Sequence, residues 1–136
     1  MAKLTPYIIS EDARAQAAFY TQALGGEIQS VMTHGQLPNA QEAIKDKVMH
    51  LSLVAGGIQF FMTDCIMEPI DRGNGMNLSL EFATEAEARE AFDKLAEGGK
   101  VKYPLEPAFW GALFGQLEDK FGVLWMISSE AKANQS

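Results

Sequence analysis

Two Gly-Gly pairs, Gly25-Gly26 and Gly98-Gly99, lie 73 positions apart in a chain of 136 residues. Each pair follows a stretch with the apolar spacing of an amphipathic helix. One strand pattern precedes each helix, and three strand patterns follow it. Glycine ends helices because it readily adopts the positive φ required just after the last turn. The repeated order predicts an α+β fold of two similar βαβββ modules.

The same offset aligns three pairs of helix residues: Ala15 with Ala88, Ala18 with Ala91, and Phe19 with Phe92. Two unrelated helices that both end in Gly-Gly would also share some alanines. The repeated order of strands and helices on both sides of each pair favours a duplication over that alternative.

The first module is predicted to have a strand at 4–9, a helix at 11–24, and strands at 27–32, 47–54 and 58–63. The second is predicted to have a strand at 76–82, a helix at 85–97, and strands at 100–103, 111–117 and 123–127. Thr84 and Glu87 form a capping box, and residues 10–12 offer an N-cap and two acidic side chains. Residues 33–47 show no apolar period and are interpreted as a surface excursion that could act as a lid.

The two helices each carry one apolar stripe for the core. The first stripe is Ala13, Ala17, Tyr20 and Leu24, and the second is Ala88, Ala91, Phe92 and Leu95. A chain of this length can bury about two-thirds of its unfolded surface, so one domain is predicted over residues 1–128. Module one is assigned to 1–66, module two to 75–128, and a loose tail to 129–136.

Eighteen acidic and eleven basic side chains give a net charge of −7, and the basic ones are scattered. This distribution argues against a nucleic-acid partner, which requires a basic stripe. No apolar run is long enough to cross a bilayer, and the first residues lack a signal-peptide core. We therefore expect no membrane association and a cytoplasmic protein. Cys65 is the single cysteine, which excludes an internal disulfide and disfavours a nucleophilic role.

Alternation along the predicted hairpin sorts its side chains onto two faces. Pairing Leu53 with Phe60 and Leu51 with Met62 gathers six apolar residues for the helices: Met49, Leu51, Leu53, Ile58, Phe60 and Met62. The opposite face then carries His50, Ser52, Val54, Gln59, Phe61 and Thr63. That mixture of polar groups and an aromatic ring suits a ligand cup, although a face that simply meets water is the alternative.

The second module sorts in the same way. Met76, Leu78 and Leu80 are expected to point inward, and Asn77, Ser79 and Glu81 outward. Near the C-terminus, Trp110 adjoins the start of a strand and is a candidate ligand contact. Phe114, Phe121 and Trp125 are expected to pack in the core, and residues 119–122 to form a hairpin turn.

Several motifs, taken in order, resemble PhnB-like proteins of the vicinal oxygen chelate superfamily, which includes glyoxalase I, bleomycin-resistance proteins and extradiol dioxygenases. They are Pro6-Tyr7-Ile8, Phe19-Tyr20, Leu24-Gly25-Gly26, Met49-His50-Leu51, Phe61-Met62-Thr63-Asp64, Gly98-Gly99-Lys100-Val101, Phe109-Trp110-Gly111, Asp119-Lys120-Phe121-Gly122 and Trp125-Met126-Ile127. The resemblance implies paired βαβββ modules, a cupped, mostly antiparallel sheet, and a homodimer.

In the metal-using members, the resemblance implies one ligand from the first and one from the last strand of each module. Those positions fall at Thr5, Phe61, Met126, and either Asn77 or Ser79. Divalent metals prefer imidazole and carboxylate donors, so no metal or other cofactor is expected. The alternative is a displaced divalent-metal site on His50 and Glu81, with a third donor from Gln59 or Asn77.

The first hypothesis is a metal-free protein that binds a small molecule in a cavity lined by His50, Gln59, Phe61, Asn77, Glu81, Trp110 and Met126. The alternative is a lyase, isomerase or dioxygenase-type enzyme with His50 or Glu81 as its catalytic candidates, with or without a metal. PhnB-like proteins are often described as demethylubiquinone methyltransferase-like. We do not expect that activity here, because the sequence lacks the glycine-rich loop and following acidic residue of a methyl-donor site. A purely structural or protein-interaction dimer has the least support.

Overall fold

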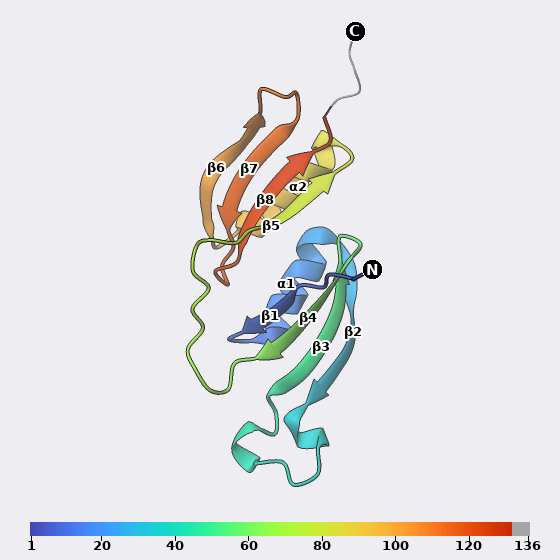
Figure 1. Ribbon diagram of the computed structural model, residues 1–136, viewed down its shortest axis with the longest axis vertical. Helices are drawn as coiled ribbons and strands as arrows, with labels where there is room; N and C mark the ends of the chain where they lie inside the picture. Colours follow the sequence, from blue (N-terminus) through green and yellow to red (C-terminus); the bar gives the residue numbers. More distant parts are fainter. Residues whose placement is uncertain (132–136) are drawn as a thin grey trace. The chain divides into compact units, whose positions relative to one another are not determined.

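The fold is seen in a computed structural model that describes residues 1–131. The same order of strands and helix occurs twice along the chain (Figure 1). The first module contains β1 (Tyr7–Ser10), α1 (Ala13–Leu24), β2 (Gly26–Thr33), β3 (Val48–Ala55) and β4 (Ile58–Asp64). The second contains β5 (Leu78–Phe82), α2 (Glu85–Ala96), β6 (Lys100–Pro107), β7 (Leu113–Glu118) and β8 (Leu124–Ser129). The chain divides into two compact units, Met1–Asp71 and Arg72 onward, and each holds one module. The predicted pair of βαβββ modules is confirmed.

Each module forms a four-stranded sheet in which the first strand joins the last. The sheet orders are β1-β4-β3-β2 and β5-β8-β7-β6. β1 runs parallel to β4 and β5 runs parallel to β8, and all other neighbours are antiparallel. The mostly antiparallel sheet is thus confirmed within each unit. A crossover helix between parallel strands explains why α1 and α2 each cover one face of their own sheet.

Both Gly-Gly pairs have the same structural role. Gly25 and Gly98 have φ of 79° and 75°, which lets the chain reverse after each helix. The next glycines lie against a neighbouring strand: a Cβ on Gly26 would lie 1.9 Å from the Val54 carbonyl oxygen. A Cβ on Gly99 would meet the Glu118 carbonyl oxygen at 2.1 Å. No side chain fits at either second position.

The 73-residue offset holds at the glycines but not inside the helices. The N-caps Asp12 and Thr84 lie 72 positions apart, and each accepts a hydrogen bond from the backbone N–H three residues on. Glu97, the C-cap of α2, is the additional residue before Gly98. The buried Tyr20 therefore corresponds to Phe92, and the predicted alignment of Ala15 with Ala88 is wrong by one residue.

Several predicted boundaries shift. β5 begins at Leu78, and Met76 is 79% exposed, so its predicted inward orientation is wrong. It precedes the strand, where no pleat fixes its direction. β6 continues to Pro107, and the excursion at 33–47 contains two short 3₁₀ turns, His34–Gln36 and Glu42–Ile44. β8 ends at Ser129, the first residue of the predicted tail. Residues 132–136 of that tail lie outside the described residues.

Apolar side chains between each helix and its sheet form the core. The predicted stripe of α2 is buried throughout, whereas α1 buries Gln16 and Ala23 and leaves Leu24 half-buried. The largest buried apolar side chains are Tyr20, Leu51, Leu53, Phe60 and Met62 in the first unit, and Leu95, Leu113, Leu117, Trp125 and Ile127 in the second.

Buried side-chain oxygens satisfy backbone groups at equivalent strand ends. The Asp64 carboxylate accepts hydrogen bonds from the N–H groups of Ala13 and Val48, both at 2.7 Å. Ser129 Oγ accepts from Leu113 N–H at 2.9 Å, at the corresponding end of β8. These contacts fasten the last strand of each module to the start of the strand beside it.

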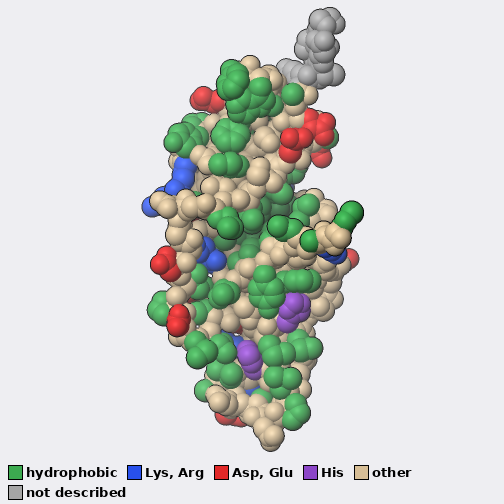
Figure 2. All heavy atoms as spheres, in the orientation of Figure 1, with side chains coloured by type: hydrophobic (Ala, Val, Ile, Leu, Met, Phe, Trp, Pro, Cys, Tyr) green, Lys and Arg blue, Asp and Glu red, His purple; other side chains and the backbone are tan. Residues whose placement is uncertain are grey.

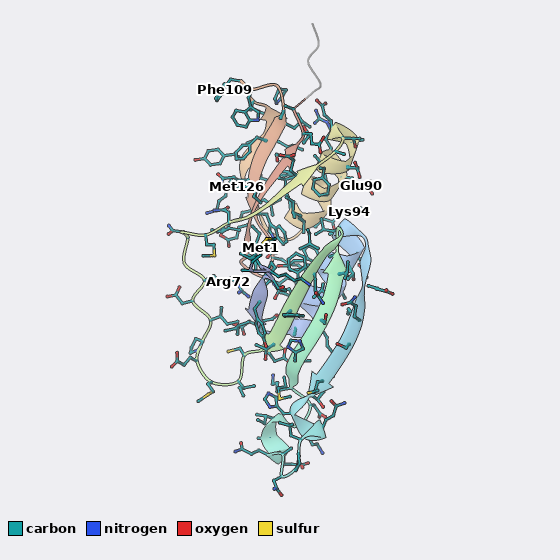
Figure 3. The ribbon with its side chains drawn as sticks, turned by 45° about the vertical axis from the view of Figure 1, so that its right-hand side comes forward. Met1, Arg72, Glu90, Lys94, Phe109 and Met126 are labelled. Atoms are coloured by element: carbon teal, nitrogen blue, oxygen red, sulfur yellow. The ribbon has the colours of Figure 1, made fainter. Side chains whose placement is uncertain are left out.

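On the exposed side of α2, Lys94 donates to Glu90 one turn earlier at 2.7 Å, and both residues are labelled in Figure 3. This hydrogen bond and the nearby positive charge lower the pKa of the Glu90 carboxyl. The pair belongs to the solvated surface of the helix.

Candidate functional site

Strand register places the predicted polar face of the first hairpin as expected. Leu53 pairs with Phe60 and Leu51 with Met62, so the predicted register is confirmed. Leu51, Leu53, Phe60 and Met62 are buried against α1. At the ends of the hairpin, Met49 is half-buried and Ile58 is 40% exposed, so Ile58 does not pack in the core as predicted. His50, Gln59 and Phe61 come together on the opposite face of the sheet.

Three rings on this face form an aromatic cluster of Tyr7, His50 and Phe61. The ring centroids are 4.8 Å apart for His50 and Phe61, 5.8 Å for Tyr7 and His50, and 6.1 Å for Tyr7 and Phe61. The Tyr7 hydroxyl lies 3.4 Å from His50 Nδ1. Tyr7 is 53% exposed, so the cluster presents apolar surface to solvent. Figure 2 shows both histidines of the chain bordered by hydrophobic side chains.

Beside the rings lies an amide cluster of Gln29, Ser52 and Gln59. Ser52 Oγ donates to Gln29 Oε1 at 2.8 Å, and Gln59 Nε2 donates to Ser52 Oγ at 3.1 Å and to Gln29 Oε1 at 3.3 Å. Ser52 is also the Cα partner of Phe61. The aromatic and amide clusters are therefore neighbours on one sheet face.

Two members of this site, Tyr7 and Gln29, are absent from the sequence prediction. Tyr7 shares the parity of Thr5 and is the Cα partner of Phe61, so alternation along the first strand could have found it. Gln29 follows Ile28, which is the Cα partner of the inward-facing Leu53, so alternation along β2 places Gln29 on the opposite face. The register shift between Ile28 and Ser30 then leaves both Gln29 and Ser30 opposite Ser52, and nothing in the local sequence signals that irregularity.

The other predicted ligand contacts belong to the second unit. Glu81 and Met126 lie on the sheet face away from α2, and Figure 3 labels Met126 on β8. Asn77 Oδ1 accepts from Gln116 Nε2 at 3.5 Å. Trp110 is 49% exposed in the loop before β7, with its ring 5.9 Å from that of Phe114. The shared cavity of these residues with His50, Gln59 and Phe61 stays a prediction.

The strand registers test which side chains stand where the metal-using enzymes carry ligands. In the first unit Tyr7, two residues after the expected ligand position Thr5, is the Cα partner of Phe61, and in the second unit Ser79 is the Cα partner of Met126. A phenol, a phenyl ring, a hydroxyl and a thioether do not supply the imidazole and carboxylate donors of such a centre. Among residues 1–131, no three His, Cys, Asp or Glu side chains gather as a metal site requires. The residues at these strand positions do not fit a divalent ion.

A shallow hollow of about 280 Å³ lies between α2 and β6 in the second unit. Its lining is Arg89, Phe92, Asp93, Val101, Pro104 and Leu105, and it includes none of the predicted ligand contacts. No helix in the described part of the chain is long and apolar enough to span a membrane.

Residues 4–127 match the profile of the glyoxalase/bleomycin resistance protein/dioxygenase superfamily. The chain belongs to this superfamily. Protein YjdN of Escherichia coli strain K12 is 28% identical over 137 residues, which cover 92% of this chain and 93% of that protein.

Solved structures of the superfamily fold agree with this assignment. Protein PA1353 from Pseudomonas aeruginosa superimposes with a TM-score of 0.83 at 37% identity, covering 96% of this chain and 98% of that one. A PhnB protein from Bacillus cereus gives a TM-score of 0.78 at 26% identity, with coverages of 94% and 99%. The resemblance to PhnB-like proteins and the superfamily fold are both confirmed.

Proposed function

We propose that this protein is a small-molecule-binding member of the superfamily that works without a metal ion, and that the aromatic and amide clusters of the first unit form the core of its site. The observation that carries the proposal is the pairing of partly exposed rings with a hydrogen-bonded amide cluster on one sheet face. A ligand that covers the rings gains about 25 cal/mol for each Å² of apolar surface removed from water. The neighbouring polar groups then set its orientation.

The proposal is metal-independent because of the side chains at the positions of the superfamily's metal ligands. The expected ligand positions Thr5, Phe61, Ser79 and Met126, and Tyr7 across from Phe61, would supply at most weak oxygen or sulfur donors. Polar recognition must then come from side chains such as the Gln59 amide and the His50 imidazole. Glu81, Asn77 and Trp110 of the second unit are proposed as further contacts.

Titration calorimetry of the purified protein against a panel of metabolites and antibiotics tests the proposal. We expect at least one compound to bind the wild type, and Phe61→Ala to weaken that binding by about tenfold or more, because the ring contact is lost. Phe19→Ala is a matched control, since Phe19 is equally half-buried but lies on α1, on the opposite side of the sheet. Equal losses in the two variants would refute the assignment of the site.

Elemental analysis of protein purified without chelator tests the metal-free part separately. We expect less than stoichiometric zinc, nickel, manganese and iron. A stoichiometric metal whose content falls in His50→Ala would contradict the proposal and favour the displaced metal site.

A second candidate function is acid–base catalysis by His50 in a lyase or isomerase. The observation that favours it is the contact between the Tyr7 hydroxyl and His50 Nδ1, which orients the imidazole through one of its two ring nitrogens. This candidate predicts that His50→Ala abolishes turnover of a ligand found in the panel while its binding persists. Binding without turnover in the wild type would contradict it.

A further inference from the structure

The donors and acceptors of the amide cluster define the ligand more closely than shape alone. Resting on the proposed function, we infer that the ligand carries a flat ring beside an acceptor oxygen, of the carbonyl or carboxylate class, and that Gln29 selects for that oxygen. Gln29 is thus a specificity-determining residue of the face.

The orientation of the amides follows from one end of the cluster. Lys3 Nζ donates to Gln59 Oε1 at 3.5 Å, so the opposite end of that amide is its NH₂ group. Gln59 Nε2 then donates to Ser52 Oγ and to Gln29 Oε1. The Ser52 hydroxyl, with its oxygen accepting from Gln59, donates to the same Gln29 oxygen.

Gln29 Oε1 is therefore occupied by two donors, while Gln29 Nε2 has no hydrogen-bond partner within residues 1–131. Gln29 is exposed, so this NH₂ group meets solvent until a ligand covers it. An unmade hydrogen bond on a covered NH₂ group is costly, and an acceptor oxygen on the ligand removes that cost. A ligand that places an N–H or O–H donor at this point would set its hydrogen against the hydrogens of the Gln29 NH₂ group, and no hydrogen bond would form.

The ring cluster fixes where the rest of the ligand lies. Ser52, the hydrogen-bond partner of Gln29, stands directly across from Phe61, and Phe61 contacts both Tyr7 and His50. A ring stacked on Phe61 thus places an attached oxygen toward Gln29.

The net charge of the chain does not explain a preference for an acceptor oxygen. The four strands of this sheet carry two carboxylates: Asp64, which is buried, and Glu27, whose Cα partner Val54 also pairs with Gln59 of the amide cluster. Lys3 adds a positive charge next to Gln59. The whole chain, however, has a net charge of −7 and would favour cations. The Gln29 NH₂ group therefore predicts a ligand with an acceptor oxygen, whereas the net charge of the chain predicts a cationic ligand.

Nuclear magnetic resonance titration of the ¹⁵N-labelled full-length chain tests the inference with three probes that share a phenyl ring: benzoate, acetophenone and benzylamine. We expect benzoate and acetophenone to shift the side-chain amide signals of Gln29 and Gln59 at millimolar concentrations, and benzylamine to bind about tenfold more weakly. Benzylamine binding equal to or tighter than benzoate at this face would overturn the inference and leave the proposed function standing. The absence of shifts on this face with all three probes would overturn both.

Gln29→Glu replaces the outward NH₂ group by an oxygen of the same shape. We expect this variant to reverse the order of the probes, weakening benzoate and acetophenone and strengthening benzylamine. Gln22→Glu makes the same change of net charge at an exposed position on α1 and should leave the order unchanged. An unchanged order in Gln29→Glu would refute a selecting role for Gln29.

Discussion

Phe60 and Phe61 are neighbours in sequence, and the pleat of β4 assigns them opposite roles. Phe60 is 1% exposed and packs against Tyr20 on the helix side of the sheet. Phe61 is half-buried on the opposite face, the ligand face, which also carries His50 and Gln59. Phe60→Ala opens a core cavity, and such truncations cost about 3–5 kcal/mol. Phe61→Ala removes ring contacts that are already partly in water, and should cost about 1 kcal/mol. Both substitutions change phenylalanine to alanine, so a difference between their unfolding free energies reflects the face of the sheet on which each ring lies.

Thermal unfolding followed by circular dichroism and calorimetry measures this difference. At about 3 °C for each kcal/mol in a protein of this size, Phe60→Ala should lower Tm by roughly 10 °C or more, and Phe61→Ala by about 3 °C. Ligand binding should show the reverse order, with loss in Phe61→Ala. Equal shifts in Tm, or a larger shift for Phe61→Ala, would refute the assignment of faces.

Three further predictions concern stability and assembly. Asp119 is buried and accepts from two backbone N–H groups and a tryptophan N–H, so Asp119→Ala should cost about 3 kcal/mol or more in urea unfolding; a loss below about 1 kcal/mol would contradict this. Gly26→Ala should prevent folding or destabilise strongly, since its Cβ would overlap the Val54 carbonyl. Gly25→Ala has open space around its Cβ and a φ of 79°, and should cost only about 1 kcal/mol by the same measurement; similar costs at both glycines would argue against the close approach. Finally, we propose a homodimer, so light scattering should give twice the 14.9 kDa chain mass, and a monomer at all concentrations tested would count against it.

The sequence predicts the elements that short-range chemistry determines. A two-residue turn at Gly56-Gly57 leaves one register for the hairpin, so the pairing of Leu53 with Phe60 follows from counting residues. Parity then places His50 and Phe61 on the same face. The N-cap at Thr84 and the stripe of α2 are equally local, and both are found as predicted.

The rest depends on irregularities that alternation does not reveal. The register shift in β2 leaves both Gln29 and Ser30 opposite Ser52, and Glu97 adds one residue between the end of α2 and Gly98. Met76 follows the alternation of β5 in sequence but precedes the strand, so its side chain is exposed. In each case one extra or unpaired residue, whose position depends on long-range packing, departs from the pattern expected from the local sequence.

Calorimetric titration with benzoate in the presence and absence of a strong chelator tests the central claim most directly. A metal-free face of rings and amides predicts the same affinity in both conditions, with about tenfold weaker binding in Phe61→Ala. Binding that disappears with the chelator and returns with added zinc or manganese, or that is unchanged in Phe61→Ala, would contradict it.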